Sequence, residues 1–215
     1  MIGKKRKVTL RLEHAAKSQV WIYMVSTFEG KRLFGRFHTT KERYEDLKGH
    51  AQFESPLSSV IGMVSLNEFV FFFYSTHEVH AYHKVDRYWE EDITPLPRTE
   101  ELLVASVGGK WLVALTRNTL NLVLSKLNVQ EFLYGDWEHQ TIPTPLGLSP
   151  NPYAERNIYL VPFCPKPDSN ALMILSTSLI DHATVWDLDC DVPNELPWSL
   201  NSLSKELLQI EPTEI

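Results

Sequence analysis

Cysteine is scarce in this chain, and its two cysteines form no recognisable site. Cys164 and Cys190 are too few for a disulfide framework, and neither lies in a CxxC pair or at metal-ligand spacing from a histidine. We therefore expect an intracellular protein, cytoplasmic or nuclear. The longest apolar run, Phe69 to Tyr74, is far shorter than a membrane span, and the N-terminus begins with charge rather than an apolar stretch. We expect neither a signal peptide nor association with a membrane.

Basic charge is scarce beyond the first residues. Lys4, Lys5, Arg6 and Lys7 supply four of the 21 lysines and arginines, which leaves 17 against 27 acidic residues in the rest of the chain. Nucleic-acid binding needs a basic face, so we expect none through the main fold. The basic run itself is a candidate nuclear-import signal, and the alternative is a solvated tail before the first strand.

Catalytic motifs are missing as well: the sequence has no GxSxG, P-loop, GxGxxG or HExxH pattern. His77, His80 and His83 are the nearest approach to a metal site, but His80 faces away from the other two on a strand. Asp187 and Asp189 stand at alternate positions of another predicted strand, so their carboxylates face the same way. The segment lacks the glycine of a calcium loop, and we interpret the pair as a solvated acidic edge that pairs with basic residues. We expect no enzyme activity, catalytic residue, metal or cofactor.

The chain is instead rich in two-residue alternation and short apolar runs separated by turn residues, which is the pattern of β-strands. Glycine is also sparse, since 13 prolines outnumber 9 glycines, so proline is expected in many of the turns. We predict strands at residues 8–13, 19–26, 32–38, 59–66, 68–75, 78–84, 102–108, 110–116, 121–127, 157–163, 171–177 and 183–189.

Aromatic residues recur along the chain at intervals of 42 to 48 residues. The matched pairs are Phe37 with Tyr82, Tyr44 with Trp89, Phe69 with Trp111, Trp89 with Trp137 and Trp111 with Tyr159. Units of this length with about four short strands are typical of propeller blades, each of which covers a face of the next. We predict an all-β domain over residues 1–198, a small β-propeller of about four four-stranded blades near 1–49, 50–97, 98–147 and 148–198. Trp89 and Trp137 are predicted to pack between blades.

Residues Ser59 to Pro97 resemble one repeat of the kelch family. Two apolar strands are followed by Tyr82, by Trp89 seven residues later, and by a Leu96-Pro97 exit. The resemblance implies a β-propeller. The KVDRYW segment also resembles the strand signature of hemopexin-like domains, which implies a compact four-bladed ring. A ring is our first expectation for the closure of the sheets, an arc completed by a partner chain the second, and a β-sandwich the third.

A helix is expected only at the C-terminus, in the segment 199–215. Leu203 and Leu207 lie four residues apart, so they share one helical face that would pack on a blade or on a partner chain. In the Pro-rich loop SPNPYAERN, Tyr153 and Arg156 form a candidate contact pair, because aromatic and arginine side chains are enriched at binding hot spots.

Repeat architecture without a convergent catalytic set favours a non-catalytic protein–protein interaction module or scaffold subunit. Its partner would be another protein chain, which in the second closure scheme completes the propeller. The alternative is a propeller enzyme or a lectin-like ligand-binding domain that acts at the central channel.

Overall fold

A computed structural model describes most of the chain between residues 11 and 196. The described residues are 11–29, 31–47, 57–93, 95–97, 101–117, 122–129, 136–142, 157–163, 169–177 and 182–196. They divide into two compact units, and the boundary falls between Leu102 and Leu103.

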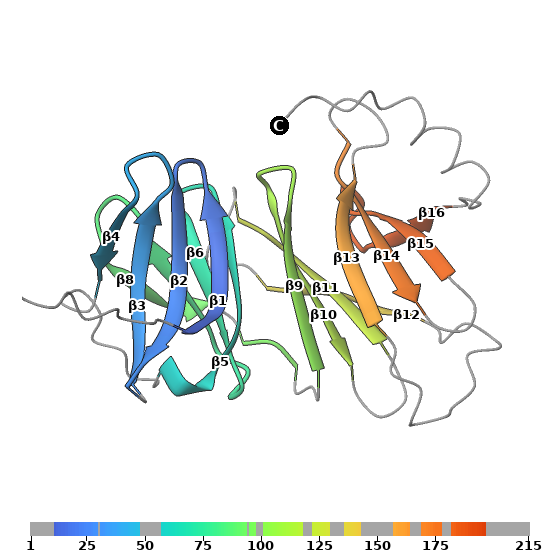
Figure 1. The fold of residues 1–215 in the computed structure, drawn as a ribbon. Coiled ribbons are helices and arrows are strands. Elements are labelled where there is room, and N and C mark those ends of the chain that lie inside the picture. The colour runs from blue at the N-terminus through green and yellow to red at the C-terminus, as the bar shows by residue number, and fades with distance from the viewer. Residues whose placement is uncertain are drawn as a thin grey trace, which may run out of the picture. The chain divides into compact units, whose positions relative to one another are not determined.

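The first unit contains two four-stranded antiparallel sheets whose strands are hydrogen-bonded in chain order (Figure 1). Sheet 1 consists of β1 (Arg11–Ser18), β2 (Trp21–Phe28), β3 (Lys31–His38) and β4 (Arg43–Asp46). A short 3-10 helix, η2 (Leu57–Ser59), precedes sheet 2, which consists of β5 (Val60–Leu66), β6 (Phe69–Tyr74), β7 (Val79–His83) and β8 (Trp89–Ile93).

The second unit repeats this arrangement. Sheet 3 consists of β9 (Glu101–Val107), which begins at the unit boundary, β10 (Trp111–Arg117), β11 (Leu122–Asn128) and β12 (Glu138–Ile142). Sheet 4 consists of β13 (Asn157–Phe163), β14 (Ala171–Thr177), β15 (His182–Asp187) and β16 (Asn194–Leu196). Four meandering four-stranded sheets are the blades of a small β-propeller, so the predicted fold class is confirmed.

Helical structure is minor in the part of the chain that the structure describes. It contains η2 and no α-helix, and no helix there is long and apolar enough to cross a membrane. The predicted C-terminal helix, with Leu203 and Leu207, lies outside the described residues.

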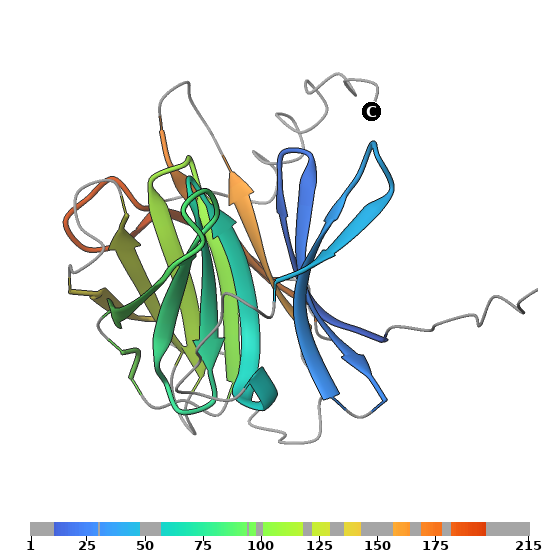
Figure 2. The same cartoon turned by 90° about the vertical axis from the view of Figure 1, so that its left-hand side faces the viewer.

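Aromatic rings pack between sheets 1 and 2 of the first unit. Figure 2 draws the strands of sheet 1 in blue and those of sheet 2 in teal to green. Phe34 of β3 meets Phe72 of β6 edge to face, with ring centroids 5.1 Å apart, and lies at the same distance from Tyr82 of β7. Trp89 of β8 completes the cluster, with centroids 5.0 Å from both Phe72 and Tyr82. Trp89 is therefore an inter-sheet core residue, as predicted.

Sheets 3 and 4 enclose the core of the second unit. Trp111, Val113 and Leu115 of β10 pack in one cluster with Leu172 of β14 and Trp186 of β15. Trp137, directly before β12, is also buried. The described residues of β10 are buried on both faces of the strand, from Trp111 to Thr116, which agrees with its continuous apolar sequence.

Strand register shows which residues are equivalent in the four sheets. Each second strand begins opposite the last residue of the third strand, and the opposed pairs are Trp21 with His38, Phe69 with His83, Trp111 with Asn128 and Ala171 with Asp187. The predicted match of Phe69 with Trp111 is therefore confirmed. The match of Trp111 with Tyr159 is wrong, because Tyr159 lies on a first strand and Ala171 holds the equivalent place.

Glycine is too sparse to form most of the tight turns, and other residues take the left-handed conformation in its place. Non-glycine residues with positive φ occur at Gln19, Glu29, Glu42, Asn67, His77 and Arg87, whereas Gly108 and Gly109 form the turn between β9 and β10. Such a conformation costs a non-glycine residue roughly 1–2 kcal/mol, which the flanking strand pairs must offset.

The aromatic seam predicts a large stability loss on truncation of Trp89. We expect Trp89→Ala to lower the free energy of unfolding by about 3–5 kcal/mol, because the substitution leaves a cavity between sheets 1 and 2. The adjacent Tyr88 is exposed, so Tyr88→Ala serves as the control and should cost less than about 1 kcal/mol. Chemical denaturation measures both, and equal midpoints for the two variants would contradict the assignment of Trp89 to the core.

Candidate protein-interaction surface

Several sequence-predicted contact residues lie outside the described part of the chain. These are the contact pair Tyr153 and Arg156, the helix residues Leu203 and Leu207, and the basic residues Lys4, Lys5, Arg6 and Lys7. The structure neither brings them together nor separates them, so their roles stay predictions.

The three histidines near β7 do not converge. His80 packs against Tyr74, with ring centroids 4.8 Å apart, whereas His83 lies on the opposite face of the strand against Phe69, at 4.9 Å. His77 lies in the turn before β7. No group of three or more histidine, cysteine, aspartate or glutamate side chains among the described residues could hold a metal ion.

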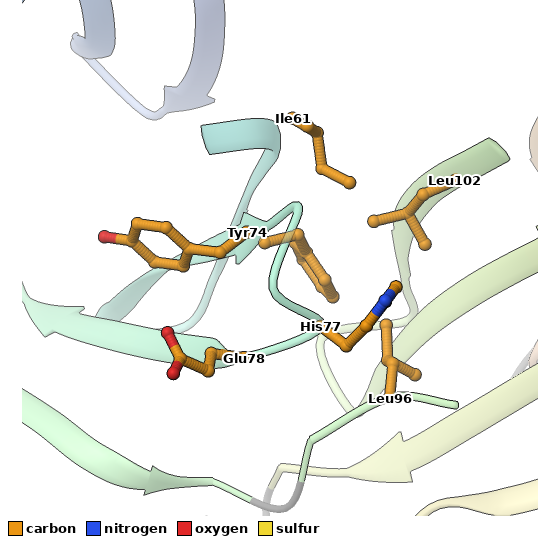
Figure 3. Close-up of a pocket in the computed structure, with 7 residues that line it drawn as sticks. Ile61, Tyr74, His77, Glu78, Leu96 and Leu102 are labelled. Carbon is orange, nitrogen blue, oxygen red and sulfur yellow. The ribbon is translucent and has the colours of Figure 1, made fainter. Parts of the chain in front are cut away.

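A small crevice opens beside His77 in the first unit (Figure 3). Ile61, Leu96 and Leu102 line it together with Phe73, Tyr74, His77 and Glu78. Its lining is almost entirely apolar, and it has no space for a water molecule. The crevice therefore has no room for a ligand.

Exposed apolar side chains gather on two of these turns. Val85 and Tyr88 lie in the turn 84–88, between β7 and β8, and are 70% and 42% exposed. Val20 lies in the turn between β1 and β2 and is 41% exposed. The Lys84 ammonium connects the two turns, because it donates to Ser18 Oγ at 2.8 Å. We call Val20, Val85 and Tyr88 the turn surface.

Burial lowers the pKa of the Lys84 ammonium, and the nearby Glu68 carboxylate partly offsets that effect. A second hydrogen bond runs from the ammonium to Ser65 Oγ at 3.2 Å. Two neutral hydroxyl acceptors on strands of different sheets therefore fix this charge. Its position keeps the turn 84–88 close to the end of β1.

The His83 ring holds the turn 84–88 in place. Its Nδ1 accepts the Asp86 N–H at 3.0 Å, and its backbone carbonyl accepts the Arg87 N–H at 2.9 Å. The other ring nitrogen, Nε2, lies 3.2 Å from Glu68 Oε2, within hydrogen-bond distance. The ring also stacks on Tyr88, with centroids 5.0 Å apart and planes 13° apart. The ring therefore supports one face of Tyr88.

Sheet 1 uses the same turn design between β3 and β4. His38 Nδ1 accepts the Lys41 N–H at 3.3 Å, and its ring contacts Trp21 with centroids 4.6 Å apart. Four residues after each histidine stands a residue with positive φ, Glu42 at 48° and Arg87 at 58°. The predicted match of the sequences around Tyr44 and Trp89 is therefore confirmed, because the turns before β4 and before β8 have the same design.

Glu45 of β4 joins sheet 1 to the turn 84–88. Its carboxylate accepts from the Arg36 guanidinium at 2.8 Å and pairs with Arg87 Nη2 at 3.1 Å. The hydrogen bond from Arg36, supported by both guanidinium charges, holds the pKa of Glu45 below its usual range. One carboxylate thus orients two arginines from different sheets.

The turn 188–193 of sheet 4 has a comparable anchor in the second unit. Lys126 of β11 is fully buried and donates to the carbonyls of Leu188, at 2.7 Å, and Cys190. Val192, on the same turn, is 46% exposed.

Asp189 anchors this turn from the other side. Trp111 Nε1 donates to its Oδ1 at 3.1 Å, and the Lys110 ammonium lies 4.0 Å from that oxygen. Burial raises the pKa of Asp189, but hydrogen bonds from the side chain and backbone of Asn170 outweigh it and hold that pKa low. Asp189 is exposed and has a basic neighbour, as predicted, but it lies after the end of β15 and its carboxylate is held by protein donors rather than only by solvent.

Sequence reasoning missed the turn surface and its anchors. A signal for the anchors was present, since Trp21 and Trp111 stand 90 residues apart and each is followed 15 residues later by a basic residue, Arg36 or Lys126. No comparable signal marked Val85 or Tyr88.

Comparisons with known proteins identify the fold and leave the family open. No family model matches the sequence, and no curated protein matches it. Among solved structures, the chain is similar to PorZ, a surface component of the type-IX secretion system of Porphyromonas gingivalis, with 11% identity over 89% of this chain and 22% of that chain and a TM-score of 0.53. It is also similar to BamB from Moraxella catarrhalis, with 15% identity over 81% of this chain and 44% of that chain and a TM-score of 0.48. The similarity to TolB from Acinetobacter baumannii has 11% identity over 84% of this chain and 42% of that chain and a TM-score of 0.44.

All three are β-propeller-like proteins, and the match to PorZ supports the same fold for this chain. The chain spans less than half of the length of each of them.

The Glu45 anchor predicts a pH-dependent stability difference. A lowered carboxyl pKa in the folded state stabilises the fold above the unfolded pKa, near pH 4.3, and this contribution is lost as pH falls through the folded value. We therefore expect Glu45→Gln to cost about 0.5–1 kcal/mol near pH 7 and almost nothing near pH 3. Thermal unfolding at several pH values measures this. Glu42→Gln, an exposed residue in the same hairpin, is the control, and a cost of Glu45→Gln that does not depend on pH would contradict the assignment.

Proposed function

We propose that this protein is a non-catalytic protein–protein interaction module and that a partner protein binds the turn surface of the first unit. The supporting observation is the exposure of Val85, Tyr88 and Val20 on turns that the rest of the unit holds in place. Exposed apolar side chains in one place are typical of contact surfaces. The partner is proposed to be another protein chain with apolar side chains at its contact surface.

The rigidity of the turn 84–88 favours binding. Association normally costs about 0.5–1.5 kcal/mol for each side chain that becomes ordered. The Tyr88 ring is already stacked on His83, and the backbone N–H groups of Asp86 and Arg87 are already hydrogen-bonded. A partner that packs on Tyr88 would therefore contact a side chain that is already ordered, so binding would cost little further conformational entropy.

Two carboxylates lie beside the ring that supports Tyr88. Glu68 and Asp86 both contact the His83 ring from exposed positions, and their carboxylate oxygens lie 3.2 Å from its two nitrogens. An apolar centre with a polar rim is the usual composition of a transient interface. The rim would orient a partner while the apolar centre supplies most of the affinity.

We expect the double substitution Val85→Glu with Tyr88→Glu to abolish partner binding without unfolding the protein. Two new carboxylates at the centre of an interface would have to be desolvated, whereas on the free surface they remain in water. Proximity labelling in cells, with quantitative mass spectrometry, would compare the wild type with this variant.

Leu12→Glu is the matched control, because Leu12 is another exposed apolar residue of the first unit, at 57%. Proteins labelled by the wild type and by Leu12→Glu should be depleted at least about tenfold by the double variant, which corresponds to about 1.4 kcal/mol. An unchanged set of labelled proteins, with thermal unfolding also unchanged, would refute binding through the turn surface.

A further inference from the structure

Sheets 1 and 3 carry the same constellation of a tryptophan, a cation and a glutamate. In sheet 1 the Arg36 guanidinium lies over the Trp21 ring at 4.1 Å and pairs with Glu45 at 2.7 Å. In sheet 3 the Lys126 ammonium lies over the Trp111 ring at 4.1 Å and pairs with Glu138 at 2.9 Å. Cation–π contact and a cross-strand ion pair thus coincide in both sheets.

The two constellations occupy equivalent positions. Each tryptophan is the first residue of its second strand, and each cation stands two residues before the end of the third strand. Each glutamate lies directly opposite its cation in the register, Glu45 opposite Arg36 and Glu138 opposite Lys126. This agreement in three strands supports a structural repeat.

Sheets 2 and 4 have no cation at the equivalent position. Register places Ala81 there in sheet 2 and Val185 in sheet 4, and both side chains are fully buried. The constellation therefore recurs in every second sheet, and one copy lies in each compact unit. The repeating element of this chain is a pair of sheets.

Each constellation contacts the third-to-fourth-strand turn of the following sheet. Glu45 pairs with Arg87 in the turn 84–88, whereas Lys126 donates to the carbonyls of Leu188 and Cys190 in the turn 188–193. The first contact joins a carboxylate to a guanidinium, and the second joins an ammonium to carbonyls. In both units, however, the contact runs from the first sheet to the turn before the fourth strand of the second sheet. These are also the turns that expose Val85, Tyr88 and Val192.

We propose that the chain is built from two copies of a two-sheet module, and that in each module the tryptophan, cation and glutamate of the first sheet position the exposed turn of the second. We call each constellation a latch. The proposal rests on the proposed function only in assigning a binding role to the turn 84–88. Arg36, Glu45 and Lys126 are accordingly positioning residues, because they act on a partner through the turn.

The physical case for positioning is that the latches lie at the seam between two sheets. A buried ion pair adds little net stability, because desolvation offsets most of the attraction, but it is specific for one geometry. The fully buried Lys126 ammonium must reach its carbonyl acceptors, so the turn 188–193 has few other places in which to lie.

Amide hydrogen exchange, followed by NMR on the full chain, tests the proposal without a partner. The probes are hydrogen-bonded amides of the two turns, those of Lys84, Asp86 and Arg87 in the first unit and those of Leu188 and Asp189 in the second. We expect Glu45→Gln to accelerate exchange in the turn 84–88 about threefold to tenfold more than in the strands of the first unit, and to leave the turn 188–193 unchanged. Lys126→Met, which retains the apolar stem, should accelerate exchange at Leu188 and Asp189 only.

The control is Glu42→Gln, which removes the same charge from the same hairpin and should leave both turns unchanged. Unchanged exchange in a turn whose latch is removed would overturn the proposal, and so would equal acceleration throughout that unit. If Glu45→Gln loosens only the turn 84–88 but leaves proximity labelling intact, the latch is supported and the binding role of that turn is refuted.

Discussion

Each unit depends on the burial of aromatic and aliphatic side chains between two facing sheets. A single four-stranded sheet cannot bury such side chains alone, because it has no second layer on its apolar face. In the first unit the rings of Phe34 and Phe72 meet at this seam, and in the second Trp111 packs with Leu172. Every other feature of the units, including the turns, takes its position from this packing.

Polar groups at the edge of the seam then fix how the sheets are aligned. Apolar packing tolerates small displacements between two sheets, whereas a guanidinium paired with a carboxylate or a buried ammonium does not. Arg36 donates to Glu45, and Arg87 of the facing sheet pairs with the same carboxylate. Lys126 is held by carbonyls across the corresponding seam. The two units thus join the corresponding sheet and turn with different donors and acceptors.

The sequence was sufficient for the fold because its signals are local. Alternation along a strand and the recurrence of aromatic residues at the ends of strands can both be recognised without knowing which sheets pack against each other. The turns of sheets 1 and 2 could also be matched, because HTTKERY and HKVDRYW share the histidine that caps each turn. The finer assignment to kelch repeats rests on residues 59–97 alone and stays a prediction.

The exposed turn was not found from the sequence, because recurrence with Trp137 marks Trp89 as a core residue but gives no signal for its neighbour Tyr88. Trp89 lies opposite Tyr82 and packs in the core between the sheets, whereas Tyr88 belongs to the turn before β8 and is exposed. The Glu45–Arg87 contact is equally hidden, because 42 residues separate the partners and only the packing of two sheets joins them.

The two held turns differ in the side chains that they expose. The seam constrains the ends of the strands, whereas Val85, Tyr88 and Val192 are exposed on the turns. In the first unit the tip carries Val85 and Tyr88, whereas in the second Val192 is accompanied by Asp189 and Asp191. A repeated support with unlike exposed residues is compatible with the proposed interaction role, because such a support would preserve the shape of the turn while the exposed residues vary.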